Sequence, residues 1–219
     1  MIRNVRALVL WSKRSREADK VVGLFTQEMG RVTVRATSAA RSTAKFASLT
    51  EPFVEAEMAV YTGPDQPWGK LVGGRMIRSF PALRTDMARI TAAAWMCEII
   101  DRMTATEQPG PEKFALLSEA LAATETASSF DLLRLGFAVR FLSYAGFGLD
   151  HWEAWQAFVR DFPERAAALH NGALADLGTQ RWDESQVAAL MQLAGRMVMD
   201  QLHRPLAVNR FRQMTGVEI

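Results

Sequence analysis

The sequence predicts an α+β protein in which a small N-terminal barrel of five β-strands precedes an all-α helical domain. Short alternating apolar segments fill residues 1–80, and from residue 81 onward apolar residues recur at helical spacing. The charge distribution changes at the same place. Residues 1–80 carry 13 basic and 7 acidic side chains, whereas residues 81–219 carry 13 basic and 17 acidic ones. We therefore expect two domains, 1–80 and 81–219, with different partners.

Bulk composition excludes several classes of protein. The 219 residues are 49% hydrophobic, which is enough for a buried core, and no uncharged apolar run is long enough to span a membrane. The single cysteine, Cys97, lies in an apolar segment, which favours a buried structural thiol over a reactive one. The histidines at 151, 170 and 203 lack zinc-ligand spacing. We expect a soluble cytoplasmic protein without a metal.

Five segments of the first domain have strand character: residues 5–11, 21–26, 31–37, 53–60 and 70–80. The third alternates strictly, so Arg31 and Arg35 are expected to point outward while the apolar residues between them point inward. Gly30 closes a turn, and the pair at 73–74 is expected to form a bulge or bend. Residues 38–50 read as a flexible or partly helical connection. This pattern fits a Greek-key barrel, of which the five-stranded OB-fold is the main nucleic-acid-binding example.

The second domain reads as helices over residues 85–103, 112–123, 128–146, 152–162 and 183–202. Thr85 or Asp86, a serine at 128 or 129, and Asp183 are suitable helix caps. The helix from 128 to 146 is apolar nearly all round, which predicts a central position in the bundle. Residues 166–179 are rich in small side chains and have no clear assignment.

The chain lacks the motifs of common catalytic sites. It contains no GxxxxGK[ST] or GxGxxG loop, no GxSxG elbow and no HExxH pair. Glu55 and Glu57 lie two apart on one strand face, a spacing that suits solvated or cross-strand-paired carboxylates better than a catalytic pair. We expect no enzyme activity and no cofactor.

Basic residues are concentrated between positions 13 and 45. A surface built from them would bind phosphates with strong salt dependence and little sequence preference. The alternative is an ordinary solvated barrel with charges on several sides. Trp68, in the turn after residue 62, is the best candidate for an exposed base-stacking ring, whereas Trp11, Phe25, Phe46 and Phe53 are expected in the core. The candidate phosphate-binding residues are Lys13, Arg14, Lys20, Arg31, Arg35, Arg41 and Lys45.

Short motifs in this order and spacing resemble the RecO family of bacterial recombination mediators. In the first domain they comprise residues 7–10, 17–20, 24–26, 28–31, 40–42 and 49–53. In the second domain they comprise residues 98–102, 137–142, 146–147 and 203–206. Each motif is weak alone, and their collinearity over most of the chain carries the resemblance.

The chain departs from the family pattern at several positions. Arg16 stands where the family has glycine, and the glycine expected near residues 38–39 is absent. Residues 207–209 replace the family's basic and serine residues near the end. Many relatives carry a four-cysteine zinc module after the central helix, but residues 148–182 contain no cysteine. This identifies a zinc-less variant, in which we expect aromatic packing instead, by Trp152, Trp155, Phe158, Phe162 and Trp182.

The resemblance implies a DNA-binding OB-fold barrel and a helical domain without cofactor or nucleotide hydrolysis. It implies binding of single- and double-stranded DNA, annealing of complementary strands, partnership with RecR, and a cytoplasmic, nucleoid-associated place in a bacterium. It also implies docking on the C-terminal tail of single-stranded-DNA-binding protein, followed by loading of RecA. An acidic tail ending in an apolar residue needs an apolar pocket rimmed by cations. The candidates are Arg134, Phe137, Arg140 and Phe141, and the alternative is that both arginines are solvated at the bundle edge.

Two other hypotheses stay open at this point. The first is a protein-only scaffold of the RecF-pathway complex, in which DNA binding is weak or supplied by partners. The second is an enzyme with an OB-fold appendage, which the lack of any site motif in residues 81–219 disfavours. Retention of DNA at low salt separates the mediator from the scaffold.

Overall fold

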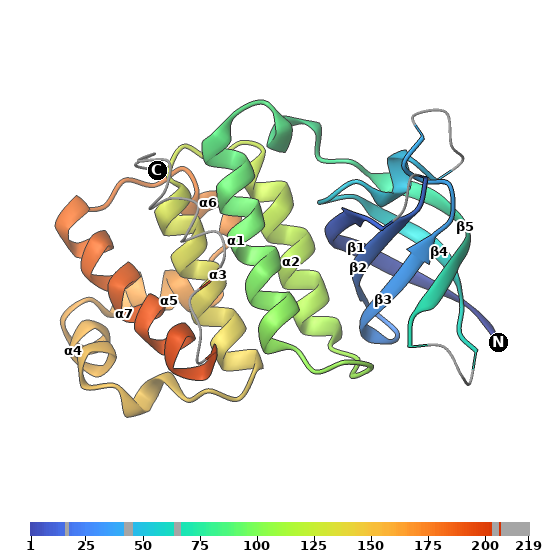
Figure 1. Ribbon diagram of the computed structural model, residues 1–219. Coiled ribbons are helices and arrows are strands. Elements are labelled where there is room, and N and C mark those ends of the chain that lie inside the picture. The colour runs from blue at the N-terminus through green and yellow to red at the C-terminus, as the bar shows by residue number, and fades with distance from the viewer. Residues whose placement is uncertain (16–17, 42–45, 64–66, 203–205, 207–219) are drawn as a thin grey trace. The chain divides into compact units, whose positions relative to one another are not determined.

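The computed structural model describes residues 1–15, 18–41, 46–63, 67–202 and 206 (Figure 1). The chain divides into two compact units. The first comprises Met1–Phe80 with Ile100–Phe114, and the second comprises Pro81–Ile99 with Ala115–Ile219. The segment from 100 to 114 thus groups with the barrel, although it is helical at both ends.

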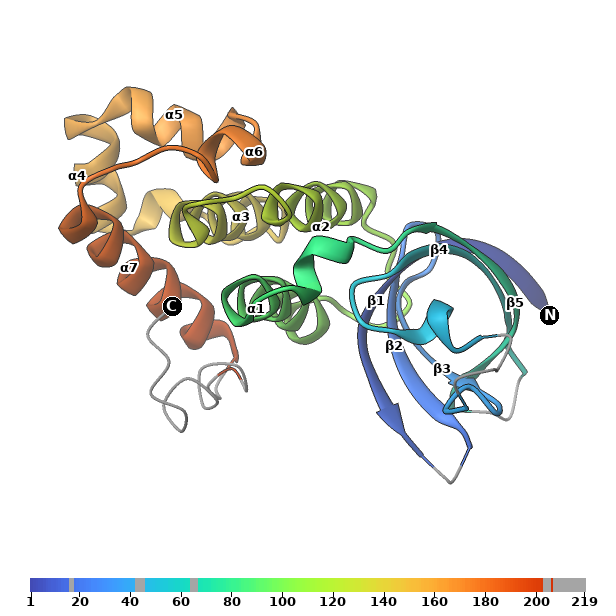
Figure 2. The same ribbon diagram turned by 90° about the horizontal axis from the view of Figure 1, so that it is seen from above.

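Five strands form the barrel of the first unit: β1 (Ile2–Arg14), β2 (Lys20–Thr26), β3 (Gly30–Ala36), β4 (Glu55–Tyr61) and β5 (Gly69–Arg78). They form a closed barrel in the order β1-β2-β3-β5-β4, with the ring of strands visible in Figure 2. All neighbouring pairs are antiparallel except β3 and β5, which are parallel. This is a five-stranded Greek-key arrangement of the OB-fold type, as the strand pattern predicts.

Inward-facing apolar side chains fill the barrel. In β3 buried and half-buried residues alternate, with Val32, Val34 and Ala36 inside, which confirms the predicted faces. The first strand is longer than its pattern predicts. Residues 13 and 14 continue β1 because they pair with Val21 and Lys20 at the start of β2. In β5 the register shifts between the partners Gly73 and Leu71, next to the predicted bulge.

Residues 100–114 pack on the outer side of the barrel within the first unit. Thr106 forms a parallel bridge with Arg31, and the Glu107 N–H donates to the Arg31 carbonyl at 3.1 Å. The Phe25 and Phe114 rings lie 6.2 Å apart. Phe25 is therefore buried although it lies on the outer face of β2.

Seven helices lie in the described part of the chain: α1 (Met87–Met103), α2 (Pro111–Thr124), α3 (Phe130–Tyr144), α4 (Glu153–Asp161), α5 (Pro163–Asn171), α6 (Leu174–Leu177) and α7 (Glu184–Leu202). Short 3₁₀ turns are η1 (Ser48–Thr50), η2 (Pro81–Arg84) and η3 (Leu149–His151). Every residue of α3 from 132 to 142 is buried, and α3 packs against α5, α6 and α7. The predicted central position of this helix is therefore confirmed. The small-residue segment without assignment contains most of α5 and all of α6.

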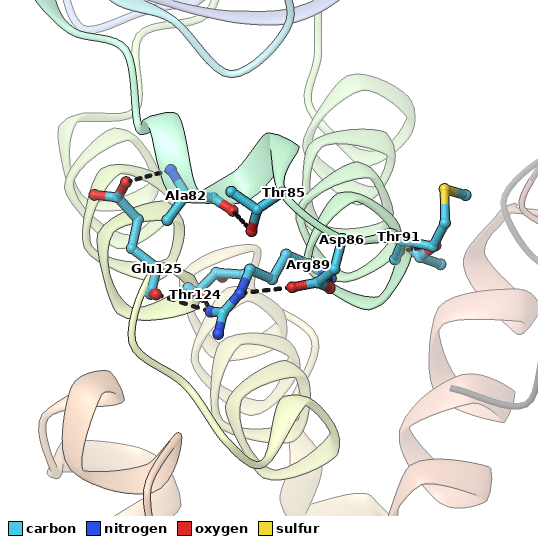
Figure 3. Close-up of polar contacts among 8 residues, drawn as sticks. Ala82, Thr85, Asp86, Arg89, Thr91, Thr124 and Glu125 are labelled. Carbon is cyan, nitrogen blue, oxygen red and sulfur yellow. Dashed lines mark hydrogen bonds and ion pairs between the residues drawn. The ribbon is translucent and has the colours of Figure 1, made fainter.

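Arg89 joins the start of α1 to the end of α2 (Figure 3). Its guanidinium donates to the backbone carbonyls of Thr124 and Glu125 and pairs with Asp86 at 2.8 Å. Asp86 also accepts from the Arg89 N–H, which makes it the N-terminal cap of α1. The Glu125 carboxylate accepts from the Ala82 N–H at 3.1 Å. A cation thus satisfies carbonyls that the end of α2 leaves without helical partners.

Two further predictions from the sequence can be compared with the second unit. Asp183 caps α7 by accepting from the Gln186 N–H, whereas Ser129 precedes α3 without a side-chain capping bond. Cys97 is buried in α1, as its apolar neighbours predict. None of the described helices combines the length and apolarity that crossing a bilayer requires.

Candidate nucleic-acid interface

A row of side chains crosses the outer face of the barrel where β1, β2, β3 and β5 lie side by side. Lys13 is the register partner of Val21, Val21 of Arg35, and Arg35 of Lys70. Directly opposed residues in neighbouring strands project to the same face of a sheet. The three cations Lys13, Arg35 and Lys70 therefore share one face, and Lys13 and Lys70 are exposed.

Two tryptophans accompany this row, and each lies beneath one of its cations. The Arg35 guanidinium lies 5.9 Å from the centre of the Trp68 ring, and Trp68 is 42% exposed. The Lys13 ammonium lies 5.3 Å from the centre of the half-buried Trp11 ring. We call the five residues Lys13, Arg35, Lys70, Trp11 and Trp68 the cation–tryptophan face.

The face is hollowed beside Trp68. A cavity of about 480 Å³ lies there, and Thr37 and Asp19 contribute to its wall together with Arg35 and Lys70. The Asp19 carboxylate accepts a hydrogen bond from the Ser38 N–H at 2.9 Å. The hollow thus combines two cations with an aromatic ring, the groups that bind phosphate and stack on a base.

Two of the seven predicted phosphate-binding residues form ion pairs. Lys20 pairs with Glu51 at 2.7 Å, and its side chain is only 13% exposed. Arg31 lies four residues before Arg35 on the same strand face, but it pairs with Asp101 at 3.4 Å and donates to the Thr106 hydroxyl. Alternation along β3 correctly predicts that Arg31 and Arg35 lie on the same face, but residues 100–114 cover the part of that face around Arg31. Neither cation belongs to the cation–tryptophan face.

The other predicted basic residues lie in different places. Lys13 and Arg35 belong to the row. Arg14 is exposed at the end of β1 but projects to the opposite face, because its partner Lys20 pairs with the core residue Ala36. Arg41 is exposed in the connection after β3. Lys45 lies outside the described residues.

Sequence reasoning missed Lys70 and assigned Trp11 to the core. Lys70 is 25 positions beyond the basic segment, and only its pairing with Arg35 brings it into the row. Trp11 follows a register irregularity after Val9 and pairs with Gly23, which places its ring on the outer face. A sequence signal for Lys70 existed, because it follows the candidate stacking residue Trp68 by two positions. The expected core position of Phe25 and Phe53 is confirmed, since both are buried.

The four residues expected to receive a partner's tail lie inside the second unit. Phe137 and Phe141 are fully buried and stack at 6.0 Å, and Arg134 is 1% exposed. Arg134 pairs with Asp131 and lies over the Trp95 ring. Neighbouring helices cover α3 along its whole apolar length, so none of the four side chains forms a pocket on the described surface.

Arg140 likewise serves the interior of the helical unit. Its guanidinium donates to the carbonyls of Leu169, at 3.0 Å, and of Gly172, at the end of α5. Burial lowers the pKa of Arg140, and the Glu119 carboxylate 3.8 Å away opposes that shift. The alternative of a solvated bundle edge is wrong for both arginines, which are buried. Tail binding by these four side chains stays a prediction, and their burial does not support it.

Aromatic rings pack in the segment after α3, where the resemblance implies a zinc module in many relatives. Phe158 lies 5.6 Å from both Trp155 and Phe162 and 6.5 Å from Trp182. This segment does not fit a zinc ion, because it contains no cysteine, and the described residues include no group of three or more His, Cys, Asp or Glu placed to bind a metal. The expected aromatic packing is confirmed for four of the five rings.

Matches to protein families agree with this fold. The family model "Recombination protein O N terminal" matches residues 1–80, and "Recombination protein O C terminal" matches residues 84–153. The chain belongs to the RecO family. The first RecO match covers all five barrel strands, and the second ends at the start of α4.

Curated relatives support the same assignment. The chain is 30% identical to "DNA repair protein RecO" of Clostridium perfringens over 146 residues, which are 65% of this chain and 57% of the relative. It is 32% identical to the RecO protein of Geobacter metallireducens, over 66% of this chain and 59% of the relative. It is 31% identical to the RecO protein of Myxococcus xanthus, over 64% of this chain and 57% of the relative. The chain therefore matches less than two thirds of the length of these relatives.

Proposed function

We propose that this RecO-family protein is a DNA-binding recombination mediator in DNA repair. The observation that carries the proposal is the cation–tryptophan face, in which three cations and two rings share one side of an OB-fold barrel. Strands β2 and β3 and the loops before β2 and β5 form the surface with which OB-folds bind oligonucleotides. The cations bind phosphates by charge, so we expect binding to depend little on the base sequence of the DNA.

The test measures how DNA affinity depends on salt. Lys13→Ala, Arg35→Ala and Lys70→Ala each remove one phosphate contact, so each flattens the slope of log K against log salt by about 0.7 for single strands. Fluorescence anisotropy of a labelled oligonucleotide measures the slope.

Arg75→Ala is the matched control, because Arg75 is an exposed β5 cation paired with Glu57. Arg31→Ala is expected to leave the slope unchanged because Asp101 and Thr106 hold that side chain. Unchanged slopes in all three row variants would remove the face from the proposal.

Membership in the RecO family supports the remaining steps of the proposal. The protein anneals complementary strands and, with RecR, helps load RecA onto DNA coated by single-stranded-DNA-binding protein, whose C-terminal tail it contacts. None of these steps consumes a nucleotide. Acceleration of oligonucleotide annealing without ATP, lost in Arg35→Ala and kept in Arg75→Ala, is the expected result.

The pairing of Lys20 and Arg31 with carboxylates favours a second candidate, the protein-only scaffold. In that case two of the basic residues expected to contact DNA serve the barrel instead. Tight binding of RecR together with no DNA retention at low salt would establish the scaffold and exclude the mediator.

A further inference from the structure

The Trp11 side chain lies against a strand position that has no side chain. Its register partner on β2 is Gly23, whose own partner on β3 is Thr33. A Cβ atom added to Gly23 would lie 2.2 Å from Cε2 and 2.3 Å from Nε1 of the Trp11 ring. No other residue type therefore fits beneath the ring as it lies. The barrel backbone at Gly23 lies against the indole, and the Lys13 ammonium lies 5.3 Å from the centre of the same ring.

The two tryptophans of the face share one feature. Each ring is near a cation that interacts with it electrostatically, Lys13 for Trp11 and Arg35 for Trp68. The rings belong to β1 and to the loop before β5, and two strands, β2 and β3, lie between them. With strands about 4.8 Å apart, the rings are separated by roughly 14 Å across the sheet. They are therefore two separate places on one surface.

From this geometry we propose that Trp11 and Trp68 are two stacking platforms for unpaired bases, and that Gly23 is the positioning residue whose lack of a side chain makes room for the Trp11 ring. The inference rests on the proposed DNA binding and adds a preference for single strands. Unpaired bases take the ring faces that the cations now approach, and the freed Lys13 and Arg35 contact the flanking phosphates. A duplex keeps its bases stacked on each other, so it uses the cations but not the rings.

Substitutions of the rings separate the two kinds of DNA. Trp11→Ala and Trp68→Ala are each expected to weaken binding of a labelled oligo-dT by roughly 5- to 100-fold. Duplex affinity and the salt slope stay as in the wild type, because stacking releases no counterions. Phe162→Ala, which removes a 41% exposed ring from the helical unit, is the control and leaves both affinities unchanged.

Gly23→Ala tests the positioning role. The added methyl displaces the Trp11 ring, so this variant loses single-strand affinity to the extent that Trp11→Ala does. Because Gly23 acts through Trp11, the double variant is no weaker than Trp11→Ala alone, which is the signature of coupled residues. Additive losses in the double variant would overturn the positioning role. Circular dichroism and duplex affinity confirm that each variant is folded.

A spectroscopic measurement gives independent evidence. Stacked bases quench indole fluorescence, so oligo-dT reduces the emission of the wild type, and Trp11→Phe and Trp68→Phe each lose part of that reduction while still binding DNA. Failure of this inference differs from failure of the proposed function. Single-strand binding with a normal salt slope that is indifferent to both alanine variants overturns the platforms alone. Absence of any DNA binding by the wild type overturns both.

Discussion

At the scale of the residue, Gly30 joins the barrel to the segment that covers it. It has a positive φ of 68°, and a Cβ atom there would lie 2.0 Å from the Gln108 carbonyl oxygen. Two separate constraints therefore require glycine: the left-handed backbone conformation and the close approach of a second backbone.

Gly30→Ala is expected to destabilise the protein by about 2–4 kcal/mol, because the loop that contains Gln108 has to move away. The measurement is the midpoint of urea unfolding. Gly146→Ala is the matched control: Gly146 also has a positive φ, 81°, but a Cβ there meets nothing within 4 Å. It should cost only the backbone penalty of about 1 kcal/mol. Equal losses in the two variants would show that Gln108 exerts no constraint.

Individual residues also show where sequence reasoning stops. Alternation places Arg31 and Arg35 on the same face of β3, and that prediction is correct. Alternation cannot predict that Asp101, seventy positions away, forms an ion pair with Arg31. A solvated position at the bundle edge was one of the two alternatives for the arginines of α3, and charged side chains are seldom buried. They are buried because Asp131 pairs with Arg134, and the carbonyls of Leu169 and Gly172 accept hydrogen bonds from Arg140.

At the scale of the element, α5 packs a half-buried histidine against an aromatic ring. His170 lies 5.5 Å from Trp155 on α4 in an edge-to-face arrangement. Burial lowers the pKa of His170 below its ordinary value of 6.5; Arg140 acts in the same direction and Asp150 opposes it. The folded form therefore holds this proton less tightly than the unfolded chain does.

Acidification is accordingly expected to destabilise the packing of α5. The His170 contribution is complete above pH 6.5, where both states are neutral, and it is lost as the pH falls toward the lowered pKa of the folded form. Thermal unfolding at a series of pH values between about 7 and 5 measures the loss. His170→Gln should flatten that dependence, whereas the exposed His151→Gln should not. An unchanged profile in the His170 variant would contradict the assignment.

Helices and strands could be predicted from the sequence because their apolar residues repeat over a few neighbouring positions. The five strands and the long helices follow from alternation and helical spacing, and the central place of α3 follows from its apolar circumference. The register between strands is not local, since it depends on which residues pair across the barrel. That is why Lys70 and the outward ring of Trp11 were found only in the structure.

At the scale of the whole molecule, the first unit is not a contiguous segment. Its barrel spans Met1–Phe80, but Ile100–Phe114 belongs to the same unit. Phe25 packs against Phe114, and the Arg6 guanidinium lies 5.8 Å from the centre of that ring. A barrel cut at residue 80 loses these contacts.

A fragment of residues 1–80 is therefore expected to be less stable than one of residues 1–116. Exposing the covered side of Phe25 alone costs about 1.5–3 kcal/mol. Thermal melting followed by circular dichroism compares the fragments. In the full chain Phe114→Ala should lower the stability by about 3 kcal/mol or more. Fragments with the same melting temperature would show that the barrel is complete without residues 100–114.

The covering of β3 has a consequence for association between molecules. The paired register of β3 with β5 is confined to Val34 and Arg35, so no strand residue that the structure describes pairs with the edge of β3 before them. An unpaired strand edge is a template on which another chain can add a strand and begin to aggregate. Thr106 and Glu107 occupy that edge at Arg31. We therefore expect the loop between α1 and α2 to limit association of the barrel with another chain at this edge, on the side away from Trp68.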